Sequence, residues 1–119
     1  MGRRKTNPDF LNGIPEMLVL QILSRTPMHG YAVVQAIKLR SNQQLQFGES
    51  SIYPVLHRLE TEGMLKIKRE TVRGRERVIY HVTRKGIARL KESRSTWESI
   101  VGAVGSFWTE DSDGQTAVA

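Results

Sequence analysis

The sequence predicts an α+β fold that is mainly helical: three helices, a two-stranded hairpin and a long C-terminal helix. Two changes in hydrophobic pattern carry this prediction. Apolar residues recur with the helical period of 3.6 as far as Gly63, and then with the strand period of 2 as far as Val82. After Thr83 a helical pattern returns. A chain of 119 residues fits one domain of ordinary size.

The first two helices are expected over 16–25 and 31–40. Pro15 suits a first helical turn, where its missing N–H has no partner to lose. Residues 1–13 are polar and carry Arg3, Arg4 and Lys5, so we expect a flexible basic arm there. The run over 16–25 is apolar on most of its surface and predicts a central core helix. One face of the second helix is expected to hold Tyr31, Val34 and Ile37, at positions i, i+3 and i+6.

The third helix, over 51–62, has the clearest pattern. Ser50 and Ser51 predict its N-cap, and Gly63 predicts its C-terminal stop. Its opposite face is polar and is left for solvent or a partner. A single apolar stripe at helical spacing consists of Ile52, Val55, Leu56 and Leu59.

Residues 65–82 predict a β-hairpin with a basic turn over 71–76. Apolar and polar residues alternate on both sides of that turn, and Gly74 lies between two arginines. The whole chain has a net charge of +6 at pH 7, but residues 66–91 alone hold 10 basic and 2 acidic side chains. Such a concentration of positive charge favours a polyanionic partner.

Three helices followed by a basic hairpin are typical of the winged helix-turn-helix, here predicted over 14–83. In that fold the third helix enters the major groove of DNA and the hairpin, or wing, contacts the backbone. The alternative is that Tyr53 packs, His57 only faces solvent and the hairpin is a solvated charged surface. The candidates for groove contact are Ser50, Ser51, Tyr53, Pro54, His57 and Arg58. The candidates on the wing are Lys68, Arg73, Gly74, Arg75 and Arg77.

The last helix is expected over 84–108, with Thr83 as its cap. Residues spaced alternately by three and four form a seam for a second helix, interrupted by Arg94. We therefore expect a homodimer and, over the acidic residues 109–119, a disordered tail. The predicted dimer interface consists of Ile87, Leu90, Trp97, Val101, Val104 and Trp108.

Three separated motifs within about residues 14–90 resemble the PadR family of transcriptional regulators. Residues 53–63 are similar to its recognition helix, and His29-Gly30-Tyr31 to the start of its second helix. The wing and the start of the fourth helix are matched by Gly74-Arg75-Glu76-Arg77, Tyr80, Val82-Thr83 and Gly86. The resemblance implies a homodimeric repressor of the short-C-terminal subfamily. It also implies an imperfect inverted-repeat operator, commonly in the regulator's own promoter region.

The resemblance further implies an effector pocket and raises a question about the wing. In drug-binding members of the short subfamily, a tryptophan on the last helix lines a pocket where paired indoles hold a flat aromatic ligand. The alternative for Trp97 is plain interface packing. Glu76 stands where the family usually has a proline, and it would repel phosphate unless it points away or pairs with an arginine. The residues expected to line a pocket here are Met17, Ser93, Trp97, Glu98 and Ile100.

Several function classes are disfavoured. The chain has no cysteine, its histidines lack metal-ligand spacing, and it contains neither a phosphate-binding loop nor a nucleophile motif. We therefore expect no metal, no cofactor and no enzymatic activity, and the short apolar runs predict no membrane segment. The expected partners are double-stranded operator DNA, a second copy and a planar aromatic effector, in the cytoplasm. The alternative is a winged-helix interaction module that binds protein or RNA.

Overall fold

The computed structural model describes the backbone of residues 6–118 and the side chains of residues 13–109. Within this range the helices are α1 (Thr6–Arg25), α2 (Gly30–Arg40), α3 (Glu49–Thr61) and α4 (Arg84–Val118). The strands are β1 (Met28–His29), β2 (Leu65–Val72) and β3 (Arg75–Val82). This order confirms the predicted class, a mainly helical α+β fold with a hairpin and a long C-terminal helix.

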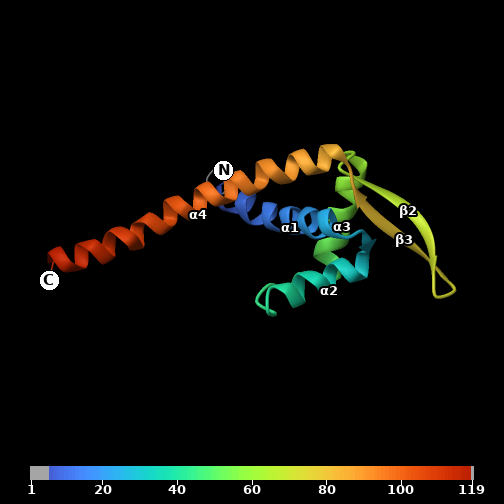
Figure 1. Cartoon of the computed structure of the whole chain (residues 1–119), viewed down its shortest axis with the longest axis horizontal. Helices are drawn as coiled ribbons and strands as arrows, with labels where there is room; N and C mark the ends of the chain where they lie inside the picture. Colours follow the sequence, from blue (N-terminus) through green and yellow to red (C-terminus); the bar gives the residue numbers. More distant parts are fainter. Residues whose placement is uncertain (1–5, 119) are drawn as a thin grey trace.

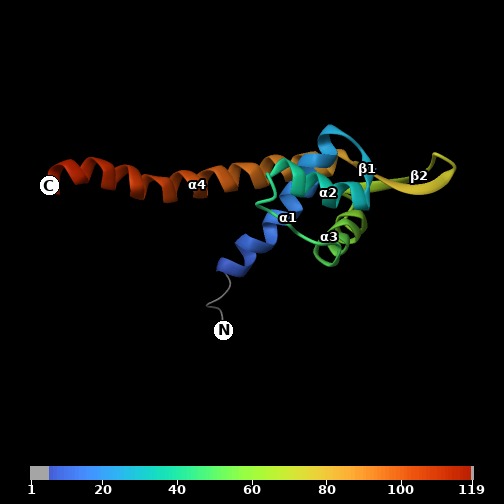
Figure 2. The ribbon, with the colours of Figure 1, turned by 90° about the horizontal axis from the view of Figure 1, so that it is seen from below.

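The molecule is elongated, with extents of 67 × 32 × 27 Å. Helix α4 lies across α1 and continues far beyond the body, while the β2–β3 hairpin projects at the other end (Figure 1). The second view shows the same extension of α4 away from α1, α2 and α3 (Figure 2). The shape therefore separates a compact body from a helix whose C-terminal half stands apart from it.

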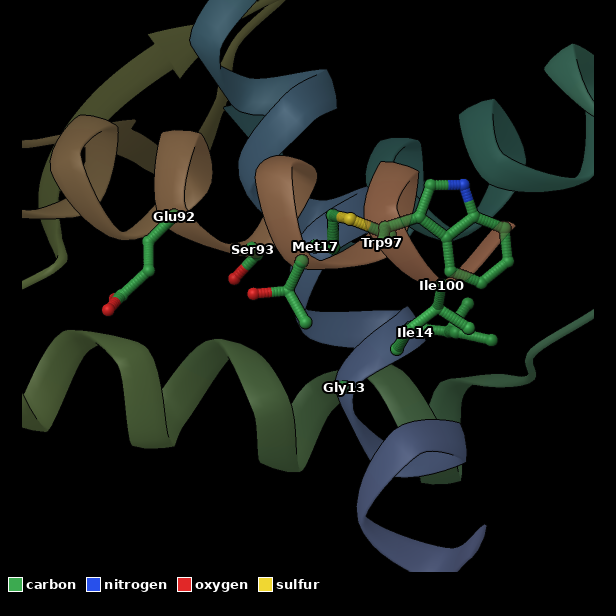
Figure 3. Close-up of a pocket in the computed structure, with 8 residues that line it drawn as sticks. Gly13, Ile14, Met17, Glu92, Ser93, Trp97 and Ile100 are labelled. Atoms are coloured by element: carbon green, nitrogen blue, oxygen red, sulfur yellow. The ribbon is translucent and has the colours of Figure 1, made fainter. Parts of the chain in front are cut away.

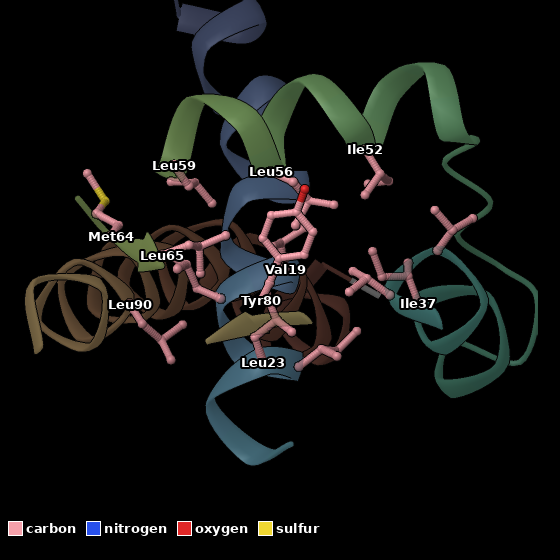
Figure 4. Packing of buried hydrophobic residues seen from close by; sticks show 14 residues of the cluster. Val19, Leu23, Ile37, Ile52, Leu56, Leu59, Met64, Leu65, Tyr80 and Leu90 are labelled. Atoms are coloured by element: carbon pink, nitrogen blue, oxygen red, sulfur yellow. The ribbon is translucent and has the colours of Figure 1, made fainter. Parts of the chain in front are cut away.

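The core forms around α1, where Val19 and Leu20 are fully buried. Helix α3 directs the predicted stripe of Ile52, Leu56 and Leu59 into this core (Figure 4). The core is completed by Val33, Val34 and Ile37 of α2, Met64, Leu65 and Tyr80 near or in the hairpin, and Leu90 of α4. Burial of this apolar surface is the main force that holds α3 against α1.

Two expected helix boundaries are wrong. Helix α1 already begins at Thr6, so residues 6–13 of the expected arm are helical and Pro15 lies inside the helix. Pro8 then falls in the first turn, where a missing N–H costs no bond. Helix α4 continues to Val118, through most of the tail expected to be disordered, because no proline interrupts its backbone bonds. Arg3, Arg4 and Lys5 lie outside the described residues.

The N-terminus of α3 differs from the prediction, whereas its C-terminus agrees with it. Gly48 is the N-cap and no side chain caps the helix, so the prediction of Ser50 and Ser51 as caps is wrong. At the other end, Gly63 has a φ of +81° as predicted. The Met64 N–H donates to the Leu59 carbonyl at 2.8 Å, and the Gly63 N–H donates to Glu60 at 3.0 Å. This pair of bonds is a Schellman motif.

The sheet contains one strand more than the predicted hairpin. Residues 28–29 form β1, which pairs with β3 so that Met28 lies opposite Tyr80 and the sheet order is β1-β3-β2. A two-residue strand has too few side chains to show alternation, so no sequence pattern predicted it. The hairpin turn is also tighter than expected. It consists of Arg73 and Gly74 alone, both with positive φ, as in a type I′ turn.

The junction between the wing and α4 is tightly packed. The Thr83 hydroxyl accepts a bond from the Gly86 N–H at 3.1 Å, which confirms Thr83 as the cap of α4. The same hydroxyl donates to the Gly63 carbonyl at 2.7 Å. A Cβ on Gly86 would lie 2.3 Å from the Met64 carbonyl oxygen. Only glycine permits this approach, which fixes the start of α4 against the end of α3.

Candidate nucleic-acid interface

The outward face of α3 presents most of the side chains expected to contact the groove. Ser50, Ser51, Pro54 and His57 are exposed, on the face opposite the buried stripe. Because the two serines do not cap the helix, their hydroxyls are not used at its N-terminus. Hydroxyl and imidazole groups on an exposed helix face can donate to and accept from base edges or phosphates.

Tyr53 is half-buried at the contact between α3 and α2. Its ring lies over Gly30, where an added Cβ would come within 2.8 Å of the tyrosine Cε1. Burial, together with the nearby Glu49 and Tyr31, raises the pKa of Tyr53 above its usual value of 10.0. The phenol is therefore protonated at neutral pH and its O–H can donate to a phosphate. The ring of Tyr53 thus makes the packing contact, and its hydroxyl is the group that can form the hydrogen bond.

The wing is the β2–β3 hairpin with its two-residue turn. Lys68, Arg73, Gly74 and Arg75 are exposed, and Arg77 is half-buried at the root of the wing. Lys68 lies opposite Ile79 in the register, so alternation places Lys68, Arg75 and Arg77 on one face of the hairpin. The same face also carries Glu70, which lies opposite Arg77. Its net charge is still positive, which is suited to neighbouring phosphates.

Glu76 lies on the opposite face of β3 from Arg75 and Arg77, because strand side chains alternate. It lines a groove of about 330 Å³ between the root of the wing and α3. The carboxylate thus lines the same groove as Arg77, Tyr53 and His57.

That groove brings together residues from α2, α3 and the wing. Tyr53 and His57 line it from α3, and Arg77 lines it from the wing. Burial, and then the charge of Arg77, lower the pKa of His29 below its usual value of 6.5, so this histidine is neutral at pH 7. The lining residues that were not among the predicted contacts are His29, Gly30, Tyr31, Glu76, Val78 and Tyr80. Tyr31 is 49% exposed, whereas Val34 and Ile37 of the same helix are buried.

Arg58 differs from the other predicted groove residues because its guanidinium is bonded within the protein. Its Nη2 lies 3.0 Å from Oε1 of Glu16, and its Nη1 lies 3.3 Å from Oε1 of Glu62. Arg89 of α4 donates from Nε to the other Glu16 oxygen at 2.7 Å. One carboxylate on α1 thus joins α3 to α4.

The Glu16 side chain is 9% exposed and carries its charge at the junction of three helices. Burial alone would raise the pKa of Glu16, but hydrogen bonds from Arg89 and Arg58 outweigh it and lower the pKa below the usual 4.5. The carboxylate is therefore ionised at neutral pH. Sequence reasoning missed this group, because a single glutamate in an apolar helix gave no indication of two distant arginine partners.

The predicted seam on α4 divides between the chain's own core and solvent. Leu90 is only 5% exposed and packs in the core, so it has almost no surface left for a partner. Ile87 is half-buried beside α1. Farther along, Trp97 is half-buried and Phe107, which was not predicted, is exposed. The remaining predicted seam residues are exposed: Val101, Val104 and Trp108.

A second groove, of about 260 Å³, lies between α1 and α4 (Figure 3). It brings together four of the five residues expected around an effector: Met17, Ser93, Trp97 and Ile100. Glu98 does not line it and instead pairs with Arg94 at 3.6 Å. The acidic side chain in the groove is Glu92, which precedes Glu98 by six residues on α4.

Comparison with known proteins agrees with this geometry. Residues 19–92 match the Transcriptional regulator PadR-like family. The chain is 29% identical over 96 residues to the transcriptional regulator Rv3488 of Mycobacterium tuberculosis, covering 81% of this chain and 87% of that protein. It is 31% identical over 99 residues to the transcriptional regulator YqjI of Escherichia coli, covering 83% of this chain and 45% of that protein.

Solved structures show the same fold. A PadR-like transcriptional regulator from Bacillus cereus has a TM-score of 0.72 and 27% identity, covering 83% of this chain and 95% of that one. The structure of smu.1704 from Streptococcus mutans has a TM-score of 0.68 and 34% identity, covering 76% of this chain and 86% of that one.

The fold and the exposed α3 face define a winged helix-turn-helix transcriptional regulator. The chain belongs to the PadR-like family of such regulators. This is a family of transcriptional regulators and not of enzymes, in agreement with the expected absence of enzymatic activity. Among the described residues, no helix is both long and apolar enough to cross a membrane.

Proposed function

We propose that this protein is a homodimeric repressor that binds an inverted-repeat operator in double-stranded DNA. The observation that carries the proposal is the groove in which Tyr53 and His57 of α3 meet the root of the basic wing. In this reading, Ser50, Ser51, Pro54 and His57 meet the major groove. Tyr53 donates to a phosphate. The DNA backbone is contacted by the wing residues Lys68, Arg73, Arg75 and Arg77, and Gly74 lets the tip of the wing come close to it.

The dimer forms through the C-terminal half of α4. Residues 14–83 then act as the DNA-binding domain and residues 84–108 as the dimerisation helix. Exposed apolar side chains on this half of α4, including Val101 and Val104, support the proposal because a second copy would remove them from water. A two-fold axis repeats each recognition helix once, which matches an operator made of two inverted half-sites.

A planar aromatic effector is proposed for the groove between α1 and α4. Met17, Ser93, Trp97 and Ile100 supply its apolar walls and one hydroxyl, and Glu92 favours a cation. We expect a planar cationic dye to bind the wild type and to bind Trp97→Ala more weakly by about tenfold or more. Equal affinity for both proteins would exclude the pocket and leave Trp97 as a packing residue.

Fluorescence anisotropy tests the DNA-binding proposal. The DNA upstream of the protein's own gene is compared with a scrambled duplex at two salt concentrations. Operator recognition predicts a preference of about 10³-fold or more, and an affinity that falls steeply with salt. Equal and weak binding to both duplexes, repeated with a genomic DNA library, would contradict it and favour a protein- or RNA-binding module.

The wing has its own test. Arg75→Ala should lower operator affinity and reduce the slope of log K against log salt by about one, because one phosphate contact is lost. Lys91→Ala is the matched control, since it removes the same charge from an exposed position on α4. Unchanged affinity for Arg75→Ala would overturn the wing assignment.

A further inference from the structure

The Glu16 carboxylate is shared between two helices that the proposed function assigns to different tasks. Oxygen Oε1 accepts from Nη2 of Arg58 on α3 at 3.0 Å. Oxygen Oε2 accepts from Nε of Arg89 on α4 at 2.7 Å. Since the two oxygens belong to one planar group, the two arginines cannot shift independently without losing a bond. The carboxylate therefore constrains the direction of α3 relative to α4.

Packing alone leaves more freedom at this contact. Apolar contacts between helices are non-directional and tolerate small rotations. Charge-assisted hydrogen bonds are short and angle-dependent, and buried ion pairs are better explained by conformational specificity than by added stability in several systems. Glu16 is almost fully buried, whereas its two arginine partners are each about 40% exposed, so the carboxylate is the fixed centre of this contact.

The positions of the two arginines link this junction to both proposed surfaces. Arg58 directly follows His57, which faces outward on the recognition helix. Arg89 stands one turn before Ser93, which lines the groove between α1 and α4. Glu16 itself directly precedes Met17, which lines the same groove. A displacement of α4 relative to α1 therefore shifts the Glu16 carboxylate and, through its bond to Arg58, shifts α3.

We propose that Glu16 is a positioning residue for operator recognition that acts through Arg58 and Arg89. It sets the angle between the recognition helix and the dimerisation helix, and thereby the half-site spacing that the dimer accepts. This inference rests on the proposed function, because spacing has meaning only for a dimer that pairs through α4. Arg58 then contributes by holding α3 in place and not by reading a base.

The spacing requirement is strict enough to measure. In duplex DNA, each added base pair between half-sites turns one of them by about 35° relative to the other. A dimer with a fixed angle between α3 and α4 loses one set of contacts after such a turn. A dimer without the Glu16 bridge can rotate its recognition helices and recover part of the loss.

The experiment measures affinity by anisotropy for duplexes whose half-sites are separated by the natural spacer, or by one or two base pairs more or fewer. Glu16→Gln keeps the shape of the side chain and removes its charge. We expect the preference for the natural spacer to fall by about tenfold, with affinity for a single half-site nearly unchanged. The sign is informative, because losing a negative charge would by itself tighten binding to every duplex alike.

Two further variants keep the test decisive. Arg89→Gln removes the bond to α4 from a partly exposed position, and it should broaden the spacing preference even where Glu16→Gln folds poorly. In the double variant the loss should not exceed that of either single change, because all act through one bridge. Glu98→Gln is the control, as it removes a glutamate from an exposed ion pair on α4.

The outcomes separate the two proposals. If the wild type shows no preference for a specific duplex, the proposed function fails. If the wild type binds its operator specifically but folded Glu16→Gln and Arg89→Gln retain its spacing preference, only the positioning role of Glu16 is overturned. A loss confined to one base pair of the half-site would identify Arg58 as a direct contact and would also overturn the inference.

Discussion

The two halves of α4 carry one heptad pattern but meet different surroundings. In the first half, Leu90 is buried in the core and Arg89 is bonded to Glu16. In the second half, Val101 and Val104 are each 47% exposed. The comparison teaches that a heptad repeat predicts which face of a helix must be covered, but not which chain covers it. The first half belongs to the fold, and the second is available for assembly.

Truncating a residue of the first half should have the largest effect. Leu90→Ala removes buried methyl groups without lowering helix propensity, and it should reduce the free energy of unfolding by about 2–5 kcal/mol. Urea unfolding followed by circular dichroism, at one fixed protein concentration, measures this. A loss below about 1 kcal/mol, typical of surface substitutions, would mean that α4 is not part of the core.

Breaking the ionic contact of the first half should have the next largest effect. Glu16→Gln should lower the free energy of unfolding by about 1–3 kcal/mol at neutral pH. This is the lower end of the range for breaking a buried ion pair, because both arginines are partly exposed. Since the pKa of Glu16 is lowered on folding, its contribution is complete above the ordinary value of 4.5 and is lost as pH falls below it.

The melting temperature measured from pH 7 down to pH 3 checks this dependence. The difference between wild type and Glu16→Gln should be constant near neutral pH and should shrink as the wild-type carboxylate becomes protonated. A difference that grows on acidification would contradict the assigned bonds.

A charge on the second half should change assembly and leave the fold intact. Val104→Asp should weaken dimerisation by about tenfold or more, because a charge would be buried in the seam, with little change in helix content. Sedimentation equilibrium measures the dissociation constant. Ser99→Asp places the same charge on the opposite side of α4 and serves as the control. Equal dissociation constants for the two variants would show that the dimer interface does not lie on this face of α4.

The smallest effect is expected where the heptad pattern is interrupted. Arg94 forms an exposed pair with Glu98 four residues later, and such pairs contribute about 0.3–0.5 kcal/mol. Arg94→Ala should therefore lower stability by no more than that, and the difference should vanish in high salt. A loss above about 1 kcal/mol that persists in salt would show that Arg94 has a buried partner across the dimer.

Local features were predictable from the sequence because their causes are local. The stripe of α3, the left-handed Gly63 and the Thr83 cap each depend on residues within a few positions of one another. The helix-to-hairpin order follows from the same short-range periodicities. Errors occurred where a local signal had a second solution, as at Pro15, which suits a first turn but lies inside α1.

The candidate site was predictable in part. The exposed face of α3 and the basic wing followed from periodicity and charge, and the residues around Trp97 followed from a family resemblance. The groove residues His29 and Tyr31 were missed because a wing packs beside α2 only in three dimensions. Arg58 looked like a free cation, since its partner Glu16 lies 42 residues away.

Three features could be read from the amino-acid sequence: the class of fold, the polar face of the third helix and the concentration of positive charge in the hairpin. The folded chain was needed to show that Glu16 pairs both with Arg58, 42 residues away, and with Arg89, 73 residues away. It was also needed to show that one heptad seam divides between core and solvent. This division arises because propensity and periodicity act over a few residues. Ion pairing and burial depend instead on which distant surfaces the folded chain brings together.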